Sequence, residues 1–372
     1  LVGERSTGDD PAGRSAHRLA LRVEEEVDKS RNEVKNLINA GHTSEIIFTR
    51  NTTEGINLVA NSLGFREGDE IVISDKEHNS NLIPWLKLRS KGIKLKIVKS
   101  NPDNTFNLEN FKKSLNEKTK LVSVVFTSNI DGVTNPIKEI AKLAHKNNSL
   151  VLVDGAQAVP SMDVNIKELD IDFLAFSGHK MMGPTGTGVL YGKKHILEQM
   201  EQFIVGGETV VDSTYESYSR EELPNRFEAG LQDYAGIIGL GEACRYLGKI
   251  GQSKIASHEI KINKIISESL LSNKKISVIG PKEAEKRSGV FSFNIEGINH
   301  HDVAKILDNS KAVLIRSGAH CAHSWFNNHN LKGSARASFY LYNTEKEAEI
   351  FLIFPESPSS TMEEYVLILS AR

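Results

Sequence analysis

The sequence has few cysteines, no long apolar run and almost no net charge, and each shortage argues against a class of protein. Only two cysteines occur among 372 residues, so we expect no disulfide framework and a reducing, cytoplasmic setting. No stretch approaches the roughly 20 apolar residues that a membrane-spanning helix needs. The 46 basic and 48 acidic side chains nearly cancel, which gives no electrostatic reason to expect nucleic acid or a membrane as partner.

The two ends of the sequence are unusual. Residues 1–13 are polar, lack the order of a signal peptide and do not begin with Met, so we expect upstream residues to be missing from this sequence. Near the other end, residues 351–360 contain two prolines where a closing helix is expected, and helix interiors tolerate proline poorly. Nothing else in the pattern explains these prolines.

Apolar and amphipathic segments alternate over most of the chain. An amphipathic helix is predicted over residues 21–38. The predicted strands are residues 45–49, 70–74, 94–98, 121–127, 150–153, 172–176 and 188–191. The predicted helices between them are residues 81–91, 107–115 and 137–147. This alternation indicates an α/β fold with a mainly parallel sheet, whose ligands gather beyond the carboxyl ends of the strands.

A second unit follows a linking helix at residues 235–250. Its predicted elements are a helix at 256–271, a strand at 289–295, a helix at 301–307 and a strand at 313–316. We expect a large domain over residues 1–247, with its N-terminal segment truncated. A small α+β domain is expected over residues 248–372.

The stretch from residue 151 to residue 191 contains the most informative chemistry. Asp154 follows one buried strand, and Lys180 closes Ser177-Gly-His-Lys180 at the end of another. A carboxylate and a lysine at neighbouring strand ends suit pyridoxal phosphate (PLP), because the lysine forms a Schiff base and the carboxylate keeps the ring nitrogen protonated. Thr52 and Thr53, at the start of a predicted helix, offer hydroxyl and N–H groups to the phosphate.

Each of these residues also has an ordinary structural interpretation. An Asp after a strand is commonly a turn residue or a cap, and paired threonines before a helix are commonly caps. A lysine in a glycine-rich loop is usually solvated, and the nucleotide pattern Gly-x-x-x-x-Gly-Lys-Ser/Thr is absent. The combination, rather than any single residue, favours a PLP site.

Six motifs occur in one order along nearly the whole chain. They are Thr52-Thr-Glu-Gly-Ile-Asn, Glu77-His-Asn-Ser-Asn, Asp154-Gly-Ala-Gln-Ala, Ser177-Gly-His-Lys180, Arg226-Phe-Glu-Ala-Gly230 and Arg316-Ser-Gly-Ala-His-Cys321. Together they closely resemble those of group II cysteine desulfurases of the SufS type, in the class V aminotransferase superfamily. The resemblance implies a fold-type I PLP-dependent transferase, with a mainly parallel seven-stranded sheet in the large domain. It also implies that L-cysteine is converted to L-alanine.

The resemblance also implies roles for individual residues. Lys180 would carry the cofactor, His78 would stack on its ring and shuttle protons, Asp154 would pair with the ring nitrogen, and Gln157 would bond the phenolic oxygen. The residues implied for the phosphate are Thr52, Thr53, Ser177 and His179. The residues implied for the substrate are Asn129, Arg316 and Arg336. We expect no metal site.

Cys321 is the residue that decides the expected reaction. It lies among Arg316, His320 and His323, and cationic neighbours favour the nucleophilic thiolate. The resemblance implies that Cys321 attacks the substrate sulfur and keeps it as a persulfide; the alternative is a buried structural thiol. Cys244 lies in a helical pattern, where a small buried thiol is expected.

The sequence departs from the family at several points and leaves alternatives open. Leu231 stands where many SufS-type enzymes have Thr, which puts a phosphate contact to a neighbouring subunit in doubt, and the loop 322–326 differs from well-known members. The resemblance implies a homodimer that supplies sulfur for iron–sulfur cluster assembly through a SufE- or SufU-like partner. Selenocysteine lyase remains an alternative. A small-molecule aminotransferase needs no thiol at Cys321, and a non-catalytic sulfur carrier needs neither Lys180 nor Asp154.

Overall fold

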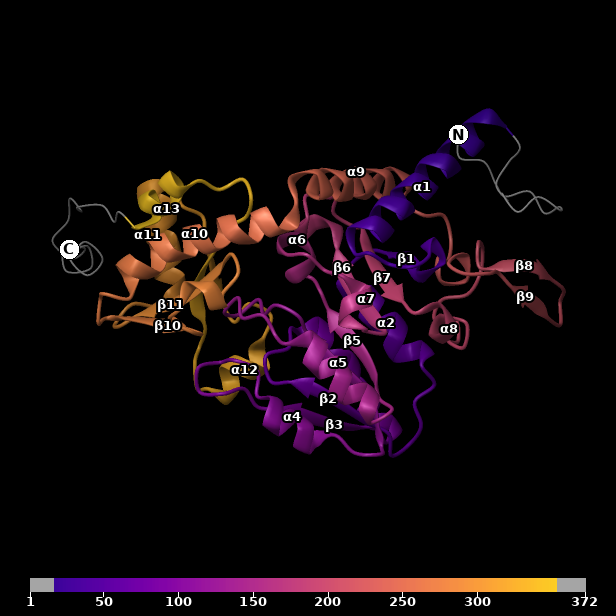
Figure 1. Ribbon diagram of the computed structural model, residues 1–372, viewed down its shortest axis with the longest axis horizontal. Coiled ribbons are helices and arrows are strands. Elements are labelled where there is room, and N and C mark those ends of the chain that lie inside the picture. The colour runs from indigo at the N-terminus through magenta and orange to yellow at the C-terminus, as the bar shows by residue number, and fades with distance from the viewer. Residues whose placement is uncertain (1–16, 353–372) are drawn as a thin grey trace.

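The fold is built on a seven-stranded sheet, seen near the centre of Figure 1. The structure is a computed structural model and describes residues 17–352. The strand order is β1-β7-β6-β5-β4-β2-β3, and every neighbouring pair is parallel except the two pairs that β7 makes. The strands are β1 (Ile46–Thr49), β2 (Glu70–Ser74), β3 (Lys94–Val98), β4 (Thr119–Val125), β5 (Leu150–Asp154), β6 (Phe173–Ser177) and β7 (Gly188–Gly192). The prediction of a mainly parallel seven-stranded sheet is confirmed.

Alternate residues of the central strands belong to two separate apolar clusters, one on each face of the sheet. Val151 and Val153 of β5 lie in one cluster, whereas Leu152 lies in the other. This is the two-residue period of a strand whose faces are both covered. The helices that contribute to the first cluster include α1 (Arg18–Leu37), α5 (Ile137–Lys146) and α9 (Tyr234–Ile250). Those of the second are α2 (Thr52–Ser62), α3 (Ile83–Leu88) and α8 (Lys194–Leu197).

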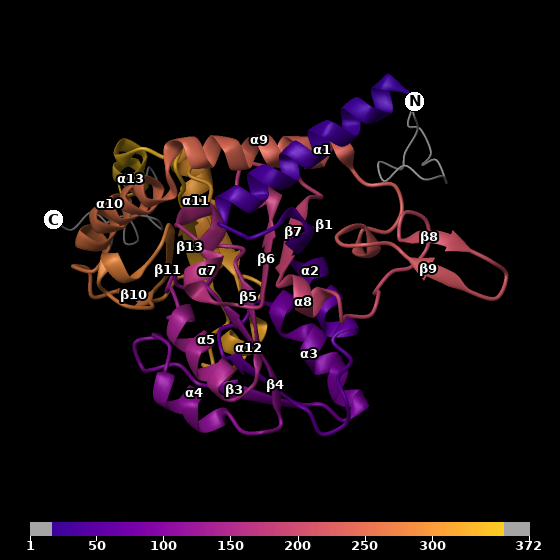
Figure 2. The same ribbon diagram turned by 45° about the vertical axis from the view of Figure 1, so that its right-hand side comes forward.

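A second, four-stranded antiparallel sheet follows α9. The chain turns at Gly251, with φ of 89°, into α10 (Gln252–Leu270), and Figure 2 shows the smaller sheet beside that helix. The strand order is β10-β11-β13-β12. The strands are β10 (Ile276–Ile279), β11 (Val290–Ile295), β12 (Arg316–Gly318) and β13 (Ser334–Ser338). The helices are α11 (His300–Lys311), α12 (His323–Asn328) and α13 (Glu345–Leu352). The predicted smaller α+β unit is therefore present.

Several details differ from the sequence prediction. The strand expected at residues 313–316 begins only at Arg316, because β12 pairs with β13 through Arg316, Ser317 and Gly318. The unpredicted elements include a hairpin of β8 (Val210–Ser213) and β9 (Tyr218–Arg220), and the short helices α6 (Ala158–Ser161) and α7 (Ile166–Leu169). The helix predicted at residues 107–115 is present as α4 (Leu108–Ser114). The prolines near residue 355 lie outside the described residues. The domain boundary at 247/248 stays a prediction, and α9 runs through it.

Among the described residues, no helix is both long enough and apolar enough to cross a membrane.

Candidate active site

A cavity of about 290 Å³ opens at the carboxyl ends of β5 and β6. This is close to the lower end of the range for small-molecule sites, about 300–1,000 Å³. Asp154 is the last residue of β5 and pairs in register with Ala175 of β6, whose chain continues directly to Lys180. The residues from the sequence prediction that line the cavity are Thr52, Thr53, His78, Asn129, Asp154, Gln157, Ser177, His179, Lys180 and Arg316.

Asp154 is buried, Lys180 is half-buried, and the opposite charges of the two residues affect each other. Burial raises the pKa of Asp154, and the charge of Lys180 opposes that rise. Burial likewise lowers the pKa of the Lys180 ammonium group, against the opposing effect of Asp154. A lysine with a lowered pKa loses its proton at a less alkaline pH and is then nucleophilic. Asp154 could therefore pair with a protonated ring nitrogen, and Lys180 could attach covalently to an aldehyde.

The N-terminus of α2 brings a group of hydroxyls to one side of the cavity. The Thr52 amide donates to Ser177 Oγ at 2.8 Å, and the Thr52 and Ser177 hydroxyls are 2.6 Å apart. Gly188 of β7 allows this close approach, since a Cβ there would lie 2.6 Å from the Cα of Asn51. Hydroxyls at the positive end of an 11-residue helix suit an anion such as a phosphate.

His78 is held with one ring nitrogen already engaged. Its Nδ1 accepts a hydrogen bond from the Ser80 amide at 3.0 Å, which places the proton of the neutral ring on Nε2. Burial, together with the charges of Lys180 and Arg316, lowers the pKa of His78 to about 4. The ring is therefore neutral near pH 7. Ser80 also lies 2.7 Å from the Thr53 hydroxyl, which links the His78 loop to α2.

Glu77 anchors the same loop to the sheet. Its carboxylate accepts hydrogen bonds from the Ser74 hydroxyl at 2.5 Å, the Asn81 amide group at 2.6 Å and the Val125 backbone at 3.0 Å. Asn81 in turn accepts from Trp85, a fully buried side chain of α3. Buried polar groups with this many partners are rigid. The contacts of Glu77 therefore fix the position of the adjacent residue, His78.

Cys321 lies beside the cavity rather than among its lining residues. Nη2 of Arg316, which does line the cavity, donates to the Cys321 sulfur across 3.1 Å. The backbone is unusual here, because His320 and Cys321 both have positive φ, 48° and 59°. The left-handed region costs an L-residue roughly 1–2 kcal/mol, so neighbouring groups must hold this loop in place.

Arg336 also adjoins the cavity through a lining residue. Its Nη1 donates to the backbone carbonyl of Asn129 at 2.9 Å. Burial, reinforced by the charge of Arg316, lowers the pKa of Arg336 to about 10, so the guanidinium is still charged at neutral pH. Its Nε has no hydrogen-bond partner among the described residues. A charged, half-buried guanidinium with a free N–H is suited to a carboxylate.

Two other residues singled out in the sequence, Cys244 and Leu231, do not line the cavity. Cys244 is 2% exposed, and burial raises the pKa of its thiol to about 12, which agrees with a structural thiol. Leu231 is 62% exposed and lines a second hollow beside α2, not the cavity. Sequence reasoning missed Ser80, which lines the cavity and bonds both His78 and Thr53. The signal was available, because Ser80 lies inside the Glu77 motif.

Comparisons with known proteins agree with this geometry. The model of the aminotransferase class-V family matches residues 7–351. The chain belongs to that family. A probable cysteine desulfurase of Halalkalibacterium halodurans is 43% identical over 345 residues, which are 90% of this class-V chain and 83% of that protein.

Solved structures give the same picture. The apo structure of a cysteine desulfurase from Thermococcus onnurineus has a TM-score of 0.88 and 39% identity, covering 95% of this class-V chain and 86% of that one. The cysteine desulfurase CsdA of Escherichia coli has a TM-score of 0.85 and 30% identity, with 93% and 86% covered. The fold and the class V aminotransferase family predicted from the motifs are therefore confirmed.

Proposed function

We propose that this protein is a cysteine desulfurase that converts L-cysteine to L-alanine and leaves the sulfur as a persulfide on Cys321. The observation that carries the proposal is the contact between Cys321 and Arg316 beside a cavity that contains both Lys180 and Asp154. A transaminase would have no use for a thiol at this point. The names of the relatives point to the same activity.

The donor set of the cavity fits PLP, the cofactor that the family implies. Lys180 would attach to it covalently, Asp154 would pair with its ring nitrogen, and Gln157 would bond its phenolic oxygen. Its phosphate would be held by Thr52, Thr53, Ser177 and His179. When bound, PLP withdraws electrons from the amino acid and so weakens bonds at the substrate's α-carbon.

Side chains in and beside the cavity would bind the substrate, transfer protons and accept the sulfur. Arg336 would bind the substrate carboxylate, and Lys180 and the neutral His78 would move protons. The Cys321 sulfur forms a bond to the substrate sulfur while the carbon–sulfur bond breaks. The electron pair of that bond stays on carbon, and a proton delivered there completes alanine. Arg316 would hold the attacking thiol in line throughout.

We further propose that the chain belongs to the SufS-type group and delivers its sulfur to a SufE- or SufU-like acceptor for iron–sulfur cluster assembly. Only 14 residues separate Cys321 from Arg336. Six of the residues in between form α12, and His320 is hydrogen-bonded to Ser334. This short, anchored segment limits how far the thiol can travel, so a partner would have to approach it.

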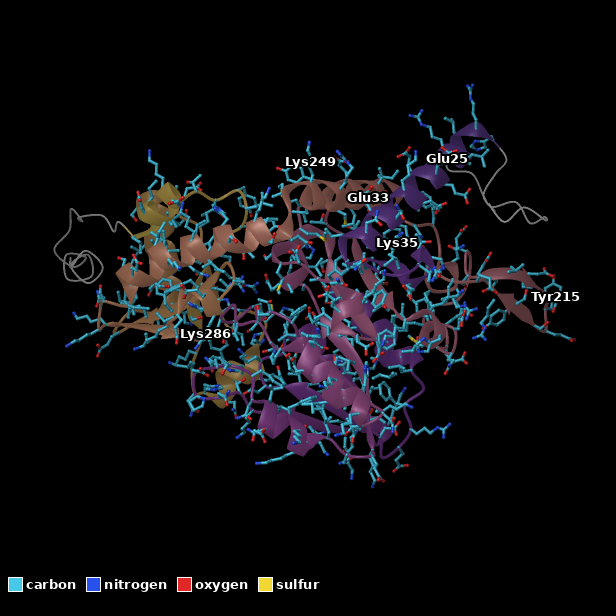
Figure 3. All side chains as sticks on the ribbon, viewed as in Figure 1. Glu25, Glu33, Lys35, Tyr215, Lys249 and Lys286 are labelled. Carbon is cyan, nitrogen blue, oxygen red and sulfur yellow. The ribbon has the colours of Figure 1, made fainter. Side chains whose placement is uncertain are left out.

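A homodimer is supported by exposed apolar residues near the cavity. Phe203, Ile204, Val205 and Leu231 are 38–62% exposed, and three of them line one hollow beside α2. Contiguous exposed apolar surface commonly marks an interface. The β8–β9 hairpin projects from the same side, and Figure 3 shows Tyr215 at its tip.

The homodimer is tested by light scattering. The measured mass should be twice the 41.2 kDa chain mass, and Leu231→Glu should reduce that mass. A monomeric wild type with full activity would refute the dimer.

The proposed activity is tested by incubating the purified protein with L-cysteine and measuring sulfide and alanine together. Equal amounts of both, formed in the presence of a reductant, support the proposal. Turnover of L-selenocysteine without turnover of L-cysteine would instead identify a selenocysteine lyase. Alanine without sulfide or persulfide would contradict both.

A further inference from the structure

Asn129 connects the two parts of the molecule at the cavity. It lies in the loop after β4, is 5% exposed, and makes two hydrogen bonds to the smaller unit. Its side-chain Nδ2 donates to the carbonyl of His320 at 2.7 Å. Its backbone carbonyl accepts from Arg336 Nη1 at 2.9 Å. One residue therefore contacts both the cysteine loop and the half-buried guanidinium of Arg336.

The loop that carries Asn129 is itself firmly fixed. Asp131, two residues further on, forms an ion pair with Lys76 at 2.9 Å, and the two side chains are 0% and 1% exposed. Lys76 also donates to the carbonyl of Asn104 at 2.6 Å, and the Gly132 amide closes the turn onto Ser128 at 2.9 Å. A buried, fully partnered ion pair gives the loop little freedom. Asn129 can thus serve as an anchor.

The loop that Asn129 contacts needs such an anchor. His320 and Cys321 are consecutive L-residues at positive φ, a conformation that lasts only where surrounding contacts impose it. The backbone carbonyls of both residues accept hydrogen bonds from loops of the large domain. The Cys321 carbonyl accepts from the Asn79 backbone amide at 2.7 Å, and the His320 carbonyl accepts from the Asn129 side chain. The Asn79 contact is made by backbone, so Asn129 is the side chain that can be tested.

We propose that Asn129 is a positioning residue that holds the Cys321 loop and the Arg336 guanidinium from one point. The distance between the sulfur-accepting thiol and the carboxylate-binding group is then set by a single buried residue. This inference rests on the proposed roles of Cys321 and Arg336. It also leaves Oδ1 of Asn129 available to a substrate, since that atom has no partner among the described residues.

Hydrogen–deuterium exchange tests the inference without relying on turnover. In the PLP-loaded protein without substrate, Asn129→Ala should speed amide exchange in the peptide spanning residues 317–324 about tenfold. That factor corresponds to about 1.4 kcal/mol. Asn129→Asp keeps the shape of the side chain, but its carboxylate cannot donate a hydrogen bond to the His320 carbonyl. It should therefore speed exchange by the same factor, and it replaces the alanine variant if that variant fails to fold. Ser292→Ala is the matched control, because Ser292 bonds the neighbouring carbonyl of Ile130 and not the cysteine loop.

The outcomes separate this role from a role in substrate binding alone. Faster exchange limited to the cysteine loop and the Asn79 segment, with Ser292→Ala within twofold of wild type, supports the proposal. Unchanged exchange in both Asn129 variants overturns it, even if KM rises. Acceleration that extends to β5 and β6 also overturns it, because the effect would then be global. Failure of the desulfurase assay would not alter any of these exchange results.

Discussion

Arg316 Nη2 donates a hydrogen bond to the sulfur of Cys321 across 3.1 Å, and Arg316 also lines the cavity that contains Lys180. The contact joins the proposed sulfur acceptor to the proposed cofactor site. The rest of the proposed mechanism depends on it.

Replacing Arg316 by Gln should therefore slow sulfur abstraction. A hydrogen bond from a charged group contributes about 1.5–3 kcal/mol, and the exposure of Arg316 favours the lower figure, so we expect kcat to fall roughly tenfold. The measurement is alanine formation at saturating L-cysteine. Arg245→Gln, which alters an exposed arginine of α9, should leave the rate unchanged. An Arg316→Gln enzyme within twofold of wild type would show that the contact has no catalytic role.

Lys180→Ala should abolish turnover and covalent attachment of PLP. The physical reason is that Lys180 is a half-buried amine in the cavity, and burial lowers its pKa against the opposing charge of Asp154. Borohydride reduction followed by peptide mapping should label Lys180 in the wild type and no lysine in the variant. Label on a different lysine would mean that the cofactor site lies elsewhere.

His78 should make the protein less stable as the pH falls. Its pKa of about 4 in the fold lies below the value of about 6.5 in an unfolded chain, so the unfolded state binds the proton more tightly. The stability from burying neutral His78 is complete above about pH 6.5 and is lost as the pH falls through 4. Urea unfolding at pH 7, 5.5 and 4.5 should show a smaller loss for His78→Gln than for the wild type.

The control for this pH effect is His195→Gln, which replaces an exposed histidine of α8. It should follow the wild type at all three pH values. Identical acid sensitivity of His78→Gln and the wild type would mean that His78 is not held in its neutral form.

The two cysteines should respond in opposite ways to substitution. Cys321→Ser should still bind PLP but release no sulfide, because the hydroxyl cannot accept sulfur. Cys244→Ala should keep activity and lose some stability, since Cys244 is buried against α1 in the main apolar cluster. Sulfide release by Cys321→Ser at the wild-type rate would require another acceptor.

Most of the large sheet could be predicted because its strands carry their own signal. The run Leu150–Asp154 is apolar up to a terminal acid, which is the pattern of a buried parallel strand with a polar end. The strand Ser334–Ser338 has no such signal, since it consists of small and polar residues. It is a strand because β11 and β12 pair with it on either side, and only the folded chain brings them there.

Some features of the candidate site could likewise be predicted from the sequence, and others could not. Residues inside recognisable motifs, such as Asp154 and Lys180, were identified from the sequence, and the structure places both in the cavity. The bond between Asn129 and His320 joins positions 191 residues apart. It depends on how the loop after β4 meets the loop after β12 in the folded chain, so no local pattern could indicate it. The positive φ of Cys321 could not be predicted either, because contacts with the surrounding residues impose that conformation.

The most direct test of the account is to find the sulfur itself. Wild-type protein loaded with PLP is incubated with L-cysteine, without reductant or partner protein, and its peptides are then analysed by mass spectrometry. We predict one added sulfur atom on the peptide that contains Cys321, none on the peptide that contains Cys244, and alanine in an amount equal to the sulfur bound. Alanine formed while Cys321 remains unmodified, or the added sulfur on Cys244, would contradict the central claim.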